Sequence, residues 1–266
     1  MALLSCGTAV VWAQTAGPTP LIRVIREELK QGKGAVHEKA ETAFVRAFSK
    51  TSAYPSYLAL ETIAGPTEAW FIERYDSYAA LEAAQQATRA EPLKSALEAA
   101  DAQDGDLRTN SRMMLAVYEK DLSYEPVPPN LAKARYVQIN TIRIRPGKFT
   151  EFADTRKLVN AAFAKSASKQ RRVVYRVTSG APTGTYFIIS ALETLKSLDP
   201  QPNAMTMPEA FGEANLAKYR TLYSDTVLNS EMLLFSINPR MSSPPKEFLT
   251  ADPDFWAPKP KSTSKP

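Results

Sequence analysis

An internal repeat is the feature of this sequence that most constrains its fold. Residues 30–33 (KQGK) match residues 145–148 (RPGK), and residues 47–50 (AFSK) match residues 162–165 (AFAK), both at an offset of 115 residues. Two further matches follow in the same order: residues 65–72 with 181–188 at an offset of 116, and residues 110–115 with 229–234 at an offset of 119. Four collinear matches predict a tandem duplication, in which each half is one supersecondary unit and the two units bury a surface together.

The repeat divides most of the 266-residue chain into two halves. These are residues 20–124 and residues 135–240, and a Pro-rich linker at residues 125–134 joins them. Residues 241–266 are rich in Pro, Ser and Lys, which predicts an extended tail. The side chains of the tail that are able to pack on the body of the protein are Phe248, Phe255 and Trp256.

Residues 1–13 predict a secretion signal. The segment from Ala2 to Ala13 has the length of the apolar region of a signal peptide, and residues 11–13 (VWA) fit the small-x-small rule for cleavage. The basic residues that usually precede such a region are missing, so either the signal is atypical or translation starts upstream of Met1. We expect a periplasmic or secreted protein. The alternatives are a cytoplasmic location and a lipoprotein signal around Cys6, although only five residues precede that cysteine.

Both halves show the same order of predicted elements. Strands at residues 21–30 and 136–145 end in a glycine turn and are followed by amphipathic helices. Hairpins, interrupted second helices and final strands then follow in each half. This order, βαββαβ, is the ferredoxin-like unit, whose antiparallel sheet carries helices on one face only. We therefore predict an α+β fold of two tandem ferredoxin-like units, whose free sheet faces pack together as a pseudo-dimeric α+β barrel.

With this order of elements, the sequence resembles the dimeric α+β barrel (ferredoxin-like) superfamily. That superfamily includes antibiotic-biosynthesis-type monooxygenases, NIPSNAP-like proteins and stress-responsive barrel proteins. The resemblance rests on a strand, a Pro-Gly-Lys turn and an amphipathic helix beginning with Phe, as in residues 143–163 (RIRPGKFTEFADTRKLVNAAF), and it extends over both halves. It implies the barrel fold without selecting an activity, because the superfamily includes cofactor-free oxygenases, haem-degrading enzymes and isomerases.

Composition and motifs exclude several classes of function. One Cys and one His cannot supply a closed zinc site or a disulfide framework, so we expect no metal site. The sequence contains no G-x-S-x-G, G-x-x-x-x-G-K-[ST] or G-x-G-x-x-G motif, and we expect no cofactor. Net charge is +5, but 33 Lys and Arg are interleaved with 28 Asp and Glu, so we expect no nucleic-acid partner. We also expect no transmembrane segment, since no other apolar run approaches the roughly 20 residues required.

His37 is the single histidine and is therefore the first candidate for a titrating group or a haem ligand. The offset of 115 places it opposite Phe152 on the apolar stripe of a helix, which favours a packed ring. Asp101, Asp104 and Asp106 flank Gly105, but their spacing does not match a calcium-binding loop. We interpret them as part of a turn that ends a helix.

Polar and aromatic residues of the predicted strands are the candidates for a ligand site in the barrel lumen. A polar side chain that points into the lumen must pair or line a wet pocket, because burying it unpaired costs several kcal/mol. Aromatic rings with a polar tip suit both a pocket and an ordinary core. Arg74 and Gln138 face the same choice between lumen and surface. The candidate site consists of Tyr57, Glu61, Trp70, Glu73, Asn140, Tyr175, Arg176 and Tyr186, together with His37.

Three classes of function remain. The first is an exported barrel protein that binds a small apolar or aromatic molecule or serves as a scaffold. The second is a cofactor-independent monooxygenase or isomerase that uses the lumen, and the third is a haem-associated protein that uses His37. A lumen pocket larger than roughly 300 Å³ with convergent polar groups would favour an enzyme. We expect a monomer with an internal pseudo-dimer, because the duplicated chain covers its own sheets; further association of such barrels is the alternative.

Overall fold

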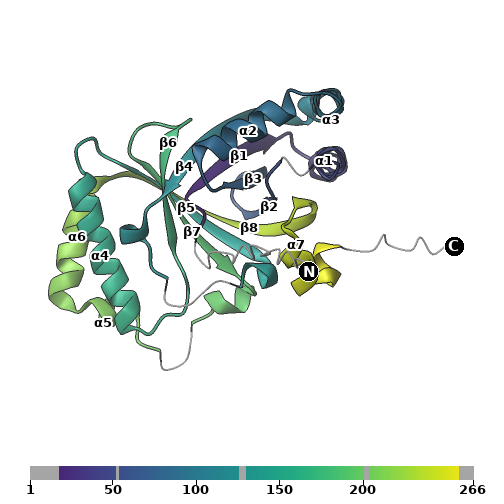
Figure 1. Cartoon of the computed structure of the whole chain (residues 1–266). Coiled ribbons are helices and arrows are strands. Elements are labelled where there is room, and N and C mark those ends of the chain that lie inside the picture. Colours follow the sequence, from purple (N-terminus) through teal and green to yellow (C-terminus); the bar gives the residue numbers. More distant parts are fainter. Residues whose placement is uncertain (1–17, 52–53, 126–129, 201–203, 258–266) are drawn as a thin grey trace, which may run out of the picture.

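The computed structural model describes residues 18–51, 54–125, 130–200 and 204–257. The predicted secretion signal and the last nine residues of the tail lie outside these ranges. Figure 1 shows a β-barrel with one group of helices on each of two opposite sides. The element order and bounds of the first half are β1 (Leu21–Leu29), α1 (Gly34–Phe48), β2 (Tyr57–Ala64), β3 (Glu68–Tyr75), α2 (Tyr78–Thr88), α3 (Leu93–Asp104) and β4 (Arg108–Tyr118).

The second half repeats this order. Its elements are β5 (Tyr136–Ile144), α4 (Phe149–Lys165), β6 (Val173–Ser179), β7 (Thr185–Leu192), α5 (Met207–Phe211), α6 (Glu213–Thr226) and β8 (Val227–Ser243). Short 3₁₀ turns, η1 to η4, lie at residues 105–107, 120–122, 131–133 and 195–198. Where the first half has α2, the described residues of the second half form the turn η4.

The eight strands form one closed antiparallel barrel in the order β1-β3-β2-β8-β5-β7-β6-β4. Within each half the last strand pairs with the first, and the first with the third. The halves join where β2 pairs with β8 and where β4 pairs with β6, for example at Leu60 opposite Ile237 and Val117 opposite Arg176. Closure leaves no free edge in the sheet that the described residues form. The predicted pseudo-dimeric α+β barrel is confirmed.

Side chains alternate between the lumen and the helices that cover the outside of the barrel. The lumen holds the largest apolar cluster, in which Trp70 contacts Phe187 and Phe235 with ring centroids 5.9 and 5.3 Å apart. On the outside, α1 covers Tyr57 and Phe71, and α4 covers Tyr186. Both faces of most strands are therefore buried.

In the structure, one pair of residues that the repeat aligns is displaced by one position. Trp70 faces the lumen, whereas Tyr186 faces α4 and contacts Phe152 with ring centroids 4.6 Å apart. The burial patterns of β3 and β7 are identical residue for residue, which aligns Trp70 with Phe187. The sequence match at residues 65–72 fails here because side chains on a strand alternate, so a shift of one residue reverses the face.

The predicted extended tail is partly folded. Strand β8 continues to Ser243, and α7 (Lys246–Ala251) and α8 (Pro253–Trp256) follow. Trp256 is buried and donates a hydrogen bond from Nε1 to the carbonyl oxygen of Ala132 at 2.8 Å. The guanidinium of Arg135 lies 3.8 Å from the ring centre of Phe255. These contacts offset the high Pro, Ser and Lys content, since aromatic burial stabilises an ordered path.

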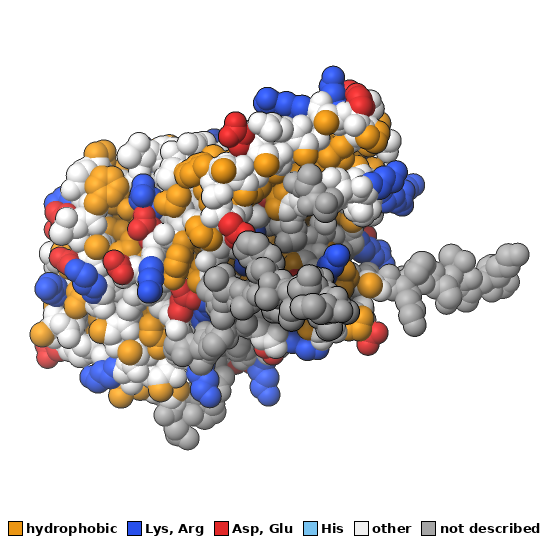
Figure 2. Space-filling view, in the orientation of Figure 1, with side chains coloured by type: hydrophobic (Ala, Val, Ile, Leu, Met, Phe, Trp, Pro, Cys, Tyr) orange, Lys and Arg blue, Asp and Glu red, His pale blue; other side chains and the backbone are white. Residues whose placement is uncertain are grey.

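Figure 2 shows basic and acidic side chains interspersed over one face of the molecule. Among the helices that the structure describes, none combines the length and apolar character needed to cross a membrane.

Candidate functional site

A cavity of about 950 Å³ occupies one end of the barrel lumen. It extends from the barrel interior to the segments that follow α4 and β7. Its volume is within the range of small-molecule sites, which are usually about 300–1,000 Å³. Aliphatic side chains from six strands form its inner wall, namely Ile22, Leu58, Leu60, Ile72, Val137, Ile189 and Ile237.

Two polar groups lie on this apolar wall. Arg74 donates from Nε to Oγ1 of Thr19 at 2.6 Å, and the Tyr175 hydroxyl donates to the backbone carbonyl of Thr19 at 3.1 Å. Burial raises the pKa of Tyr175, while the charge of Arg74 acts in the opposite direction. Both groups are thus hydrogen-bond donors at neutral pH. In the part of the chain that the structure describes, Arg74 has no carboxylate partner within ion-pair distance, so it is available to an anionic ligand.

Beyond the strands, the mouth of the cavity is lined by three basic residues and one acidic residue, Glu193. Lys169, Arg171 and Arg172 line it, and Arg171 forms an ion pair with Glu125. The guanidinium of Arg172 lies 3.5 Å from the ring centre of Phe163, and burial lowers the pKa of Arg172 to about 10. The entrance therefore attracts anions.

At the lumen end opposite the cavity, the polar side chains of Glu68 and Arg26 pack around Trp70 and close the barrel. The indole Nε1 donates to Glu68 at 2.7 Å, and Arg26 donates to the same carboxylate at 2.6 Å. Arg26 also contacts the indole ring, with its Cζ 5.2 Å from the ring centre. Trp70 is consequently in the lumen, as predicted, but does not line the cavity.

Most other residues of the predicted site lie outside the lumen. Tyr175 lines the cavity, as does Arg74. The remaining seven face the helices or the outer surface. Asn140 and Tyr186 face α4. Arg176 pairs with Glu119 at 2.5 Å, and the Glu61 carboxylate accepts a hydrogen bond from Asn238 at 2.8 Å. Those seven are Tyr57, Glu61, Glu73, Asn140, Arg176, Tyr186 and His37. Whether any of the nine residues binds a ligand stays a prediction.

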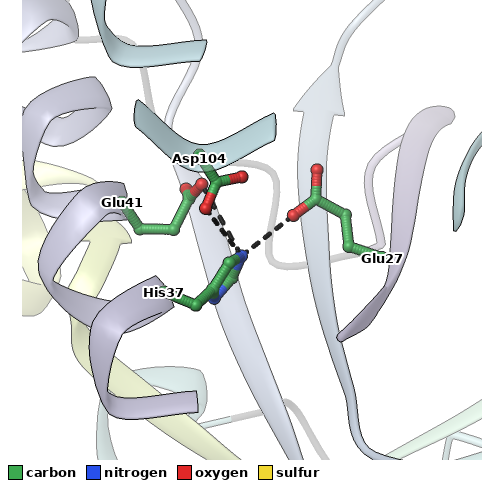
Figure 3. Close-up of side chains that lie close together, drawn as sticks. All are labelled: Glu27, His37, Glu41 and Asp104. Carbon is green, nitrogen blue, oxygen red and sulfur yellow. Dashed lines mark hydrogen bonds and ion pairs between the residues drawn. The ribbon is translucent and has the colours of Figure 1, made fainter. Parts of the chain in front are cut away.

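A second polar group lies between the barrel and the helices of the first half (Figure 3). His37 and Glu41 lie one turn apart on α1, Glu27 is on β1, and Asp104 is the last residue of α3. His37 Nε2 is 3.0 Å from Glu27 Oε2, 3.6 Å from Asp104 Oδ1 and 3.8 Å from Glu41 Oε1. All four residues are buried, with His37 and Asp104 at 0% exposure. We call these four residues the His37 cluster.

Arg108 is the cation beside the His37 cluster. Its Nη1 contacts Glu27 at 2.7 Å and its Nε contacts Asp104 at 3.1 Å, while Nη2 binds the exposed Asp101 at 2.5 Å. Burial and the neighbouring carboxylates raise the pKa of Glu41, and burial raises that of Asp104. Arg108 therefore lies beside three buried carboxyl groups, and it also forms an ion pair with a fourth carboxylate, that of the exposed Asp101.

The second half has a different set of residues at these places. Helix α4 begins 115 residues after α1, and the strand pairing aligns Arg108 with Val227. By these offsets, the cluster corresponds to Ile142, Phe152, Arg156 and Tyr223. Those four side chains line a smaller cavity of about 200 Å³. Arg156 is buried, and burial lowers its pKa to about 10.

Sequence reasoning missed the His37 cluster. The expectation that His37 packs on an apolar stripe is corrected in part: the ring is buried, but carboxylates surround it. Asp104 ends α3 and precedes the turn η1, as predicted, but its side chain is buried and faces His37. The spacing of His37 and Glu41 (i, i+4) was a readable signal, because such residues share a helix face. Glu27 and Asp104 come from other elements, and only the fold brings them together.

The surroundings of His37 do not fit a haem. A haem iron needs an axial ligand that faces a cavity large enough for the macrocycle, and His37 lines neither of the two cavities described above. Its Nε2 is directed at carboxylates instead. We therefore derive no haem chemistry through His37.

The fold is shared with several solved structures of low sequence similarity. An anthrone oxidase-like protein superposes with a TM-score of 0.57 at 12% identity, covering 84% of this chain and 93% of that one. A proposed monooxygenase from Fusobacterium nucleatum gives 0.53 at 14% identity, covering 83% and 93%. A mutant chlorite dismutase from Candidatus Nitrospira defluvii gives 0.50 at 11% identity, covering 88% and 96%.

At these identities, the likeness shows the fold alone. No protein-family model matches the sequence. A search of curated proteins likewise gives no significant match.

Proposed function

We propose that this protein binds a small apolar or aromatic molecule carrying an acidic group in the lumen of its barrel. The observation that carries the proposal is the 950 Å³ cavity, with an aliphatic wall and Arg74 as a cation without a carboxylate partner among the described residues. The apolar wall favours burial of a ring or chain at about 25 cal/mol per Å². Arg74 would bind the acidic group, with the basic mouth steering it inward.

Two fluorescent probes that differ mainly in a sulfonate test this proposal. We expect the full-length protein to bind 8-anilinonaphthalene-1-sulfonate and neutral N-phenyl-1-naphthylamine with one site each, measured by fluorescence titration. Arg74→Met should weaken binding of the sulfonate about tenfold, or about 1.4 kcal/mol, since a charged hydrogen bond is lost. The same change should alter binding of the neutral probe by less than about twofold.

Two further variants control this experiment. Leu58→Trp places a large ring on the cavity wall and should reduce binding of both probes, whereas Arg143→Met removes an exposed arginine outside the cavity and should change neither. Equal loss of both probes in Arg74→Met would argue against an acidic ligand. No binding of either probe would leave the scaffold function as the better explanation.

A second candidate function is oxygenation of an aromatic substrate in the same cavity. The volume exceeds 300 Å³ and polar groups converge on it, which favours an enzyme. Binding is favoured over oxygenation because the polar groups on the apolar wall, Arg74 and Tyr175, are hydrogen-bond donors, and a cofactor-free oxygenase needs a base to activate its substrate. Glu193 is the one carboxylate among the described lining residues, and it lies beyond the end of β7 rather than on that wall.

Oxygen consumption measures this second function directly. With an anthrone as substrate, an oxygen electrode should record no more than the rate in buffer. A protein-dependent rate that falls at least tenfold in Tyr175→Phe would instead support an enzyme of the monooxygenase type.

A further inference from the structure

The His37 cluster brings three buried carboxyl groups to one imidazole ring. Glu27, Glu41 and Asp104 are 4%, 5% and 0% exposed, so water screens them little. Arg108 is the one arginine in contact with these carboxyl groups among the described residues, and it also pairs with Asp101. Unbalanced buried charge is costly, and proteins offset it with protons or bound cations.

The carboxylate oxygens of Asp104 are able to accept further contacts. It is fully buried, and neither of its oxygens accepts a hydrogen bond from any residue that the structure describes. Its Oδ2 has only the ion-pair contact with Arg108, and Oδ1 is directed toward His37 Nε2 at 3.6 Å (Figure 3). A buried carboxylate oxygen without a hydrogen-bond donor is rare in folded proteins, and a bound ion is one of the groups that can supply the missing partner.

The spacing of the donor atoms suits a metal ion. One ligand atom from each of the four residues lies within 4.8 Å of all the others. Ligands held at about 2.0–2.2 Å from a cation are roughly 3.0–3.6 Å apart when adjacent and up to about 4.4 Å apart when opposite. The distances from His37 Nε2, which range from 3.0 to 3.8 Å, are close to these values. An ion could therefore bind after small side-chain movements.

We propose that Glu27, His37, Glu41 and Asp104 bind one divalent transition-metal cation beneath α1 and α3. An imidazole combined with carboxylates suits Mn²⁺, Fe²⁺ or Zn²⁺, whereas Ca²⁺ prefers six to eight oxygen ligands. The described residues of the second half form no equivalent site, because Arg156 occupies the position of Glu41 and Ile142 that of Glu27. The expected stoichiometry is one ion per chain. This site is separate from the lumen cavity and does not depend on the proposed function.

Metal retention by the full-length protein tests the site. After treatment with EDTA and dialysis, the protein is incubated with Mn²⁺ or Zn²⁺ at pH 7.5, desalted and assayed by inductively coupled plasma mass spectrometry. We expect one equivalent to be retained. At free metal about 100-fold above Kd, the thermal midpoint should rise by about 5 °C or more.

Matched variants locate the ion. Asp104→Asn and His37→Gln should lose the retained metal and the metal-dependent rise in midpoint. Asp101→Asn removes a carboxylate of the same helix that touches Arg108 from outside, and it should keep both. Circular dichroism of the metal-free variants establishes that they fold, so that lost binding is not lost structure.

The proposal is overturned if neither Mn²⁺ nor Zn²⁺ is retained by the folded wild-type protein. It is overturned equally if folded Asp104→Asn and His37→Gln retain the metal as Asp101→Asn does. Failure of probe binding in the lumen would leave this result unaffected, since the two sites share no residue.

Discussion

Cutting the chain within residues 126–129 should give two fragments that cannot fold alone. Each half has helices on one face of its sheet only, and the other face forms the lumen core shared with its partner. Separation would also break the β2–β8 and β4–β6 pairings. Each fragment would expose several hundred Å² of apolar surface. At about 25 cal/mol per Å², this would cost on the order of 10 kcal/mol or more, comparable to the whole stability of a typical domain.

Expression of the two halves measures this dependence. Residues 20–124 alone should aggregate or dimerise through the sheet, and co-expression with residues 135–240 should give a soluble one-to-one complex by size-exclusion chromatography with light scattering. The uncut chain is the control. Two fragments that are each soluble, monomeric and cooperatively folded would show that the halves are independent, and the lumen site would then lose its structural basis.

The barrel could be predicted because its determinants are local and repeated. Strand alternation, the glycine turns and the helix periodicity of each half give βαββαβ without any long-range information. Pairing of the two sheets then follows from their uncovered faces. The closed order of the eight strands agrees with this prediction.

The side to which each strand residue points was harder to predict. In this barrel both faces of most strands are buried, one by the lumen and one by helices, so alternation of polar and apolar residues is weak. Tyr57 and Glu73 lie under the helices for this reason, whereas Trp70 and Tyr175 lie in the lumen. The sequence shows that neighbouring residues of a strand point to opposite faces of the sheet. It does not show which of these faces is the lumen.

The His37 cluster illustrates a second limit. The repeat gave His37 the position of Phe152, and that position is buried, as expected. Two residues at equivalent positions of the repeat can nevertheless have different neighbours. Glu27 approaches from β1 and Asp104 from the end of α3, 67 residues further along the chain than His37. Contacts of that kind depend on helix placement, which hydrophobic periodicity does not specify.

Loss of Glu73 should be among the most damaging single substitutions in this protein. Glu73 is buried between β3 and the helices, and it lies directly across the strand pair from Arg23. Arg23 donates to its two oxygens at 2.5 and 2.9 Å, and Tyr75 donates at 2.8 Å. Tyr54 donates a further hydrogen bond to the same carboxylate. Four donor bonds thus converge on one buried anion.

The cost follows from the charge that would remain. Burial alone lowers the pKa of Arg23, but the hydrogen bonds and charge of Glu73 outweigh burial and raise it. Glu73→Leu would leave this guanidinium buried without a counter-ion, and the hydroxyls of Tyr54 and Tyr75 would lose their acceptor, although Tyr54 still accepts from Arg23 at 3.0 Å. Removing one partner of a buried pair typically costs about 3–5 kcal/mol. That is a large fraction of the roughly 5–15 kcal/mol by which a domain is stable.

Urea unfolding of a small set of variants separates lost charge balance from lost packing. Glu73→Leu should lower the free energy of unfolding by about 3–5 kcal/mol, and the double variant Arg23→Met/Glu73→Leu should recover most of this, because apolar groups of similar volume can replace a buried pair. Asp154→Ala breaks an exposed pair with Lys157 and should cost about 1 kcal/mol or less. If the double variant is no more stable than Glu73→Leu, the carboxylate is needed for shape and hydrogen bonding rather than to balance Arg23.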